Sequence, residues 1–82
     1  MEKTIHNVAY QELIAWLKSC REKKGLSMRE LAILLDVSHS WVAKVEQLER
    51  RLDILEYVRL CKCLRVDPEK GIKRIKSAVK KK

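Results

Sequence analysis

The sequence predicts an all-α fold in which five short helices form one domain over residues 1–82. Apolar residues make up 46% of the chain, and they recur at the i, i+3, i+4 and i+7 spacing of amphipathic helices. The chain contains one proline, two glycines and no phenylalanine, so signals for tight hairpins and β-strands are scarce. At this length the apolar content suffices for one modest helical core.

The first helix is predicted over residues 8–24, after a loose polar arm of residues 1–7. Asn7 is a residue type that caps helix N-termini, and Gly25 supplies the left-handed conformation that ends a helix. The apolar stripe of this helix comprises Tyr10, Leu13, Ile14, Leu17 and Cys20. Trp16 lies beside the stripe and is expected to be half-buried.

Residues 27–48 form a predicted helix-turn-helix core. Ser27 and Glu30 match the S-x-x-E capping box, so a helix is expected to begin there. Asp36 tolerates the left-handed backbone at the end of this helix, and Ser38 caps a second helix. The inward faces of the two helices comprise Leu31, Ala32, Leu35, Val42 and Val45.

The solvent-facing positions of the second helix in this pair carry hydrogen-bonding side chains. They are His39, Ser40 and Lys44. A short helix with polar side chains at its start fits the major groove of DNA. Lys44 is suited to donate to guanine O6 and N7, whereas His39 and Ser40 discriminate less between bases.

A charged loop over residues 47–51 is expected to precede the fourth helix. Asp53 and Glu56 form a second capping box at the start of that helix. Its predicted inward face comprises Leu55, Val58, Leu60 or Cys61, and Leu64.

The last helix is predicted over residues 68–79, with Asp67 as its cap and Pro68 at its first position. Gly71 is expected to weaken it, and the lysines at 80–82 are expected to fray. The apolar stripe of this helix comprises Ile72, Ile75 and Val79. Because so small a monomer leaves little for the stripe to pack on, it is a candidate dimer interface. The alternative is that it covers the monomer core.

The chain is strongly basic. Nineteen Lys and Arg residues stand against eleven Asp and Glu residues, which gives a formal net charge of +8. Such a charge favours a polyanionic partner, above all nucleic acid. A basic surface that serves only solubility is the alternative.

The three cysteines, Cys20, Cys61 and Cys63, are odd in number, which argues against a disulfide framework. Cys61 and Cys63 point about 200° apart on a helix, so we expect buried apolar thiols and no metal site. The sequence has neither an apolar run of membrane-spanning length nor the start of a signal peptide. These features predict a cytoplasmic protein.

Residues 13–68 resemble the Cro/CI-type helix-turn-helix domain, the XRE family of phage and bacterial repressors, with its lambda-repressor-like bundle of five helices. The matching positions, in order, are Leu17, Arg21, Gly25, Leu26, Ser27, Leu31, Ala32, Val37, Ser38, Trp41, Val42, Val45, Glu46, Arg51, Leu52, Asp53, Val66, Asp67 and Pro68. This ordered set covers about two-thirds of the chain and is far more specific than any one of its parts.

The resemblance implies a role for each candidate site residue, by its place relative to the matching positions. His39, Ser40 and Lys44 would contact bases, and Ser27 and Ser38 would bind phosphates. The further expected DNA contacts are Met28, Arg29, Trp41, Gln47, Arg50 and Arg51. Trp41 would meet a thymine methyl group or a sugar, or else simply brace its helix.

The resemblance also implies an ion pair between Arg21 and Glu46, with a structural role. Two positions depart from the family pattern. Met28 replaces a common glutamine, so one phosphate contact is expected to be either missing or supplied by Arg29. Leu48 replaces a common glycine after the third helix, which affects the loop that carries Gln47.

Taken together, these features predict a sequence-specific DNA-binding transcriptional regulator, a repressor, that reads an operator half-site as a homodimer. The alternative is a DNA-binding antitoxin that also binds a protein partner. An enzyme is not expected, because the sequence shows no catalytic triad, phosphate-binding glycine loop or cluster of metal ligands. We likewise expect no cofactor and no small-molecule ligand.

Overall fold

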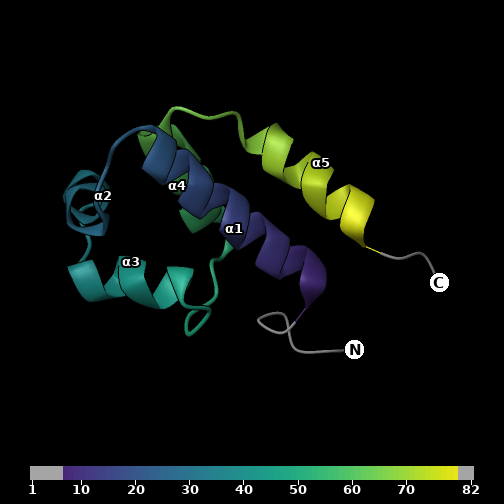
Figure 1. Ribbon diagram of the computed structural model, residues 1–82, viewed down its shortest axis with the longest axis horizontal. Coiled ribbons are helices and arrows are strands. Elements are labelled where there is room, and N and C mark those ends of the chain that lie inside the picture. The colour runs from purple at the N-terminus through teal and green to yellow at the C-terminus, as the bar shows by residue number, and fades with distance from the viewer. Residues whose placement is uncertain (1–6, 80–82) are drawn as a thin grey trace.

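The computed structural model describes residues 7–79, and every regular element among them is an α-helix. The helices are α1 (Val8–Lys23), α2 (Met28–Leu35), α3 (His39–Glu46), α4 (Ile54–Leu64) and α5 (Pro68–Ala78), as Figure 1 shows. The predicted all-α, five-helix fold is confirmed. Residues 1–6 of the expected arm and the lysines at 80–82 lie outside the described residues. In the described part, no helix combines the length and apolar character needed to cross a bilayer.

Each helix begins at the cap that the sequence predicts. The capping residues are Asn7, Ser27, Ser38, Asp53 and Asp67. Both predicted capping boxes are closed in both directions, at α2 and at α4. Gly25 and Asp36 adopt the expected left-handed conformation, with φ of 71° and 59°. Arg65 ends α4 in the same way, at φ 57°, which was not predicted.

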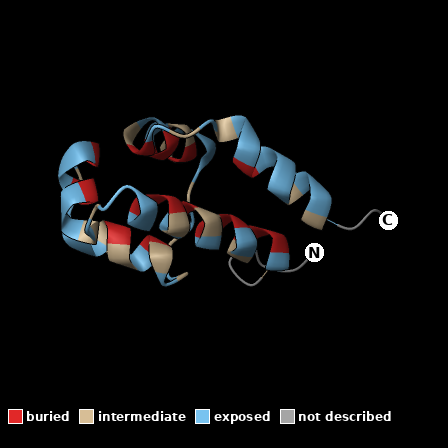
Figure 2. Cartoon of the chain, turned by 45° about the horizontal axis from the view of Figure 1, so that its top comes forward, coloured by how far each residue is buried: buried red, intermediate tan, exposed pale blue. Residues whose placement is uncertain are grey.

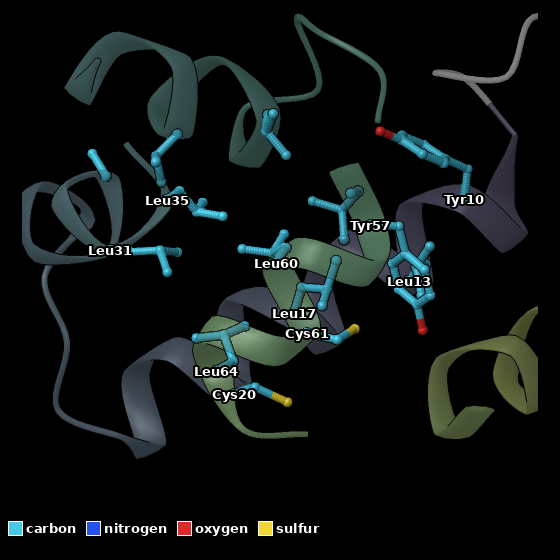
Figure 3. Close-up of a cluster of buried hydrophobic side chains, with 14 residues drawn as sticks. Tyr10, Leu13, Leu17, Cys20, Leu31, Leu35, Tyr57, Leu60, Cys61 and Leu64 are labelled. Carbon is cyan, nitrogen blue, oxygen red and sulfur yellow. The ribbon is translucent and has the colours of Figure 1, made fainter. Parts of the chain in front are cut away.

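The core lies between α1 and the other helices. α1 packs against α3, α4 and α5, while α2 packs against α3 and α4. In Figure 2 the buried faces of the helices turn toward one another, and Figure 3 shows the side chains that meet there. Cys20 and Cys61 are buried and Cys63 is half-buried; all three are free thiols. Within residues 7–79, no three His, Cys, Asp or Glu side chains gather closely enough to hold a metal ion.

The inward face of α4 differs from the prediction at Leu55, which is 73% exposed. Counting inward positions from Tyr57 instead gives the observed face, which comprises Tyr57, Leu60, Cys61 and Leu64. The Tyr57 ring is buried in the core, and its hydroxyl donates a hydrogen bond to the backbone carbonyl of Pro68. The amphipathic stripe was therefore predicted with the wrong starting residue.

The contact between α1 and α5 depends on Gly71, which the sequence suggested would only weaken the helix. Gly71 is buried, and a Cβ atom there would lie 2.8 Å from side-chain atoms of both Leu13 and Trp16. It would also overlap the hydroxyl of Tyr57. Since Cβ atoms essentially never approach so closely, the absence of a side chain lets α5 lie directly on α1.

Candidate nucleic-acid interface

The third helix has one face in the core and the other in solvent. Val42 and Val45 are 2% and 3% exposed, which fixes the rotation of α3 about its axis. The opposite face leaves His39, Ser40 and Lys44 exposed. The three side chains expected to contact bases therefore share one accessible surface at the start and middle of α3.

The N-termini of α2 and α3 are both held by serine caps. The Ser38 hydroxyl accepts a hydrogen bond from the backbone N–H of Trp41 at 3.1 Å and lies 3.2 Å from the hydroxyl of Ser40. The Ser27 hydroxyl accepts from the N–H of Glu30 at 3.0 Å. Both serines are exposed, so each helix start can meet an anion from solvent.

At the start of α2, however, a carboxylate already occupies one donor. Glu30 accepts a hydrogen bond from the Ser27 N–H at 2.8 Å, and this bond lowers the pKa of Glu30. Met28 is half-buried and packs on the core, so its side chain is turned away from a phosphate. Arg29, in contrast, is exposed and offers the cation that a phosphate contact needs.

Arg50 links the loop after α3 to α4. Its guanidinium donates to both carboxylate oxygens of Glu56, at 2.9 and 3.0 Å, and to the carbonyl of Arg51 at 2.8 Å. It also lies 4.9 Å from the centre of the Trp41 ring, within the range of a cation–π contact. The hydrogen bonds from Arg50 lower the pKa of Glu56. Arg50 thus has partners within the protein, which suits a positioning residue better than a phosphate contact.

The loop itself contains a residue in an unfavourable conformation. Leu48 has a φ of 63°, in the left-handed region that favours glycine, and its half-buried side chain packs on the core. The N–H groups of Glu49 and Arg50 both donate to the carbonyl of Lys44. The loop thereby makes the turn that glycine commonly makes in the family, while Gln47 stays exposed.

The expected pair of Arg21 and Glu46 is present. Arg21 Nε and Nη2 donate to the two carboxylate oxygens at 2.7 and 3.0 Å, and Nη1 donates to the carbonyl of Leu26 at 2.7 Å. Only 9% and 8% of the two side chains are exposed, and the hydrogen bond to Glu46 raises the pKa of Arg21. The pair joins the end of α1 to the end of α3.

Most of the predicted contact residues are exposed in the structure. The exposed members are Ser27, Arg29, Ser38, His39, Ser40, Lys44, Gln47 and Arg51. Trp41 is half-buried beneath Arg50. The predicted dimer stripe lies apart from them on α5, and it is divided: Ile75 packs against the core, whereas Ile72 and Val79 are 43% and 54% exposed.

The long-range contacts of two supporting residues, Glu56 and Tyr10, were not predicted from the sequence. Glu56 was predicted as a capping residue, but its bonds to Arg50 come from a contact that forms only in the fold. Tyr10 was predicted as a core residue, yet its hydroxyl also accepts a hydrogen bond from the N–H of Leu52 at 3.1 Å. This bond fastens the end of the loop to α1. Neither contact has a local signal in the sequence.

Known proteins share both the sequence pattern and the architecture. A family model described as a helix-turn-helix domain matches residues 12–70. An XRE-family-like protein from Pseudomonas syringae pv. tomato is 35% identical over 94% of each chain, with a TM-score of 0.83. The restriction-modification controller protein C.AhdI from Aeromonas hydrophila is 28% identical over 73% of this chain and 87% of its own, with a TM-score of 0.68.

A third solved structure extends the likeness in fold. The clp gene regulator ClgR from C. glutamicum has a TM-score of 0.75 and covers 92% of this chain and 97% of its own, at 21% identity. No curated protein sequence matches this chain.

Proposed function

This chain belongs to the helix-turn-helix domain family, in its XRE branch, and from that premise we propose that it is a sequence-specific transcriptional regulator. In this proposal a homodimer represses transcription by reading an operator, with α3 of each subunit in the major groove of one half-site. A single reading helix covers few base pairs. Two half-sites about one helical turn (roughly 34 Å) apart would supply the necessary specificity.

The observation that carries the proposal is the two-sided character of α3. Its apolar face is anchored by Val42 and Val45, while Ser40 and Lys44 project into solvent from the opposite face. The anchored helix fixes the backbone positions from which the polar side chains project, which favours base recognition because each hydrogen bond is directional.

The contacts divide into reading and positioning roles. His39, Ser40 and Lys44 read base edges in this proposal. The backbone phosphates meet the cation of Arg29 and that of Arg51. The remaining contacts to the DNA backbone come from Ser27, Ser38 and Gln47. Arg50 and Trp41 hold the loop against α4 and act through their neighbours.

The homodimer is proposed to form through the exposed part of the α5 stripe. Ile72 and Val79 leave 43% and 54% of their surfaces exposed, which is apolar area that a second subunit could cover. We expect Ile72→Ser to shift the chain toward monomer in sedimentation experiments. Ile33→Ser is the matched control, because Ile33 is 75% exposed on α2. A chain that sediments as a monomer before mutation would remove the dimer from the proposal.

In vitro selection of bound duplexes tests the function directly. An enriched palindrome with two half-sites is expected, and binding to it should weaken with salt by a logarithmic slope of about −0.9 for each neutralised phosphate. Reporter expression from a promoter that contains the selected site then tests repression. Enrichment of no sequence, together with a flat salt response, would refute the proposal.

A further inference from the structure

A basic groove lies between α1 and α5, apart from the reading helix. One part has a volume of about 590 Å³ and is lined by Glu12, Trp16, Lys70, Lys73 and Arg74, among others. A second part of about 340 Å³ shares Glu12, Trp16 and Arg74 and extends to Lys23. We propose that this α1–α5 groove is a docking site for a segment of a partner protein in which acidic and apolar side chains alternate.

Trp16 gives the groove an aromatic lining, and it packs against the core. Trp16 is half-buried and lines both parts of the groove, so it offers apolar surface between them. The guanidinium of Arg74 lies 5.6 Å from the centre of the Trp16 ring, where the ring attracts it. Gly71 allows α5 to approach α1 closely, and this approach sets Arg74 beside Trp16.

The walls of the groove carry positive charge that no ion pair between described residues neutralises. Lys23, Lys70, Lys73 and Arg74 stand against the single carboxylate of Glu12. The ion pairs formed within residues 7–79 join other side chains, those of Arg21 with Glu46 and of Arg50 with Glu56. Four cations around a tryptophan complement a segment that has carboxylates on its edges and an apolar side chain at its centre.

The groove and the reading surface lie on different sides of the molecule. α5 packs on α1 and α4, whereas α3 packs on α1 and α2, and in Figure 1 α3 and α5 flank α1 on opposite sides. On α5, Lys70 and Arg74 lie four residues apart along one flank, and Ile72 projects from another. A docked segment therefore leaves both α3 and the exposed apolar stripe of α5 accessible.

Two features favour a peptide over a second nucleic-acid duplex as the occupant. Glu12 lines both parts of the groove, and its carboxylate can accept a hydrogen bond from a peptide N–H, a donor that a phosphate backbone does not offer. The apolar surface of Trp16 lines both parts of the groove. An extended segment can place a side chain there, whereas a wide, rigid duplex reaches raised surfaces more readily.

The test uses the full chain, labelled with ¹⁵N, and a short synthetic peptide in which Asp and Glu alternate with Leu. A counterpart with Asn and Gln in place of the acids controls for charge. We expect the acidic peptide to shift the amide signals of Trp16, Lys73 and Arg74. The signals of α3 should stay in place, and the amide counterpart should produce no shifts.

Paired charge reversals then separate the groove from the overall charge. Lys70→Glu with Lys73→Glu should weaken peptide binding by about tenfold. Lys18→Glu with Lys62→Glu changes the net charge equally at exposed sites outside the groove, and it should weaken binding much less.

Three results would overturn the proposal. Equal weakening by both double variants would mean that only net charge matters. Peptide-induced shifts confined to α2 and α3 would place the site elsewhere. Displacement of the peptide from the groove by an unrelated DNA duplex would make the groove a nucleic-acid surface. The location of the peptide site is read from the amide shifts of the unmodified chain, so this result does not depend on whether a variant folds.

Discussion

Replacing Gly71 with alanine should change the free energy of unfolding in two opposing ways. In an exposed helix interior, alanine is more favourable than glycine by about 1 kcal/mol. Gly71→Ala would therefore stabilise α5 if the helix stood alone. In the folded chain, the new methyl group would lie 2.8 Å from Leu13 and from Trp16, and would overlap the hydroxyl of Tyr57.

The crowding is expected to exceed the gain in helix propensity. Extra methyl groups in packed cores cost about 1–3 kcal/mol, and three contacts at once place this site near the upper end. Movement of the Tyr57 hydroxyl would also strain its hydrogen bond to Pro68, which contributes about 1 kcal/mol. After the propensity gain is subtracted, Gly71→Ala should lower the free energy of unfolding by about 3 kcal/mol.

Urea unfolding followed by far-UV circular dichroism measures this free energy. Ser77 is exposed on the same helix, so the difference between Ser77→Ala and Ser77→Gly gives the propensity effect alone. That difference should favour alanine. In a Tyr57→Phe background the cost of Gly71→Ala should be smaller, because the hydroxyl that the methyl group would overlap is gone.

The reasoning would be refuted if Gly71→Ala raised the free energy of unfolding by the same amount that separates the two Ser77 variants. It would also be refuted if the cost were identical in the Tyr57→Phe background and remained small. Either result would mean that α5 moves away from α1 at little cost.

Three further perturbations probe the ion pairs and the reading helix. Arg21→Ala should cost about 3 kcal/mol in urea unfolding, because it leaves the carboxylate of Glu46 buried without its cation; a loss below 1 kcal/mol would contradict a buried pair. The hydrogen bonds from Arg50 lower the pKa of Glu56 in the folded state. The stability that Glu56 contributes is therefore complete above the unfolded pKa of about 4.3 and is lost as pH falls through the lower folded value. Glu56→Gln should flatten the fall of Tm over that acidic range, and an unchanged slope would count against the assignment. Lys44→Ala should remove about 1–3 kcal/mol of discrimination at one base pair, and equal weakening at all sequences in binding titrations would exclude it as a base reader.

Local signals in the sequence sufficed for the helix starts. The side chains of Ser27, Ser38 and Asp53 accept hydrogen bonds from N–H groups three residues ahead, so their role depends only on neighbouring residues. The left-handed end of α2 at Asp36 is local in the same sense. Such features need no knowledge of the tertiary fold.

Features that depend on contacts between distant segments were predicted less well. Leu55 fits the helical spacing as well as Tyr57 does, and only the packing against α1 and α5 selects Tyr57 for the core. From the local sequence, Gly71 is expected only to weaken α5, but the three side chains that crowd it come from α1 and α4. Arg50 was predicted as a cation available to DNA, and its ion pair with Glu56 forms only when the fold brings the two residues together.

The same difference between local signals and contacts of distant segments applies to the candidate site. The exposed positions of α3 follow from its helical period, so the exposure of Lys44 could be predicted from spacing. The basic groove could not be predicted, because Trp16 and Arg74 are far apart in the sequence and approach only when α5 folds back along α1.

The two tryptophans of the chain each lie beside a guanidinium, Trp41 next to Arg50 and Trp16 next to Arg74. Indole fluorescence responds to nearby charge and to exposure to water, so the chain carries an intrinsic optical reporter on each of its two candidate surfaces. Trp16→Phe would leave an emission that reports only on the reading side. Trp41→Phe would leave one that reports only on the groove, and occupancy of the two surfaces could be followed separately without an attached dye.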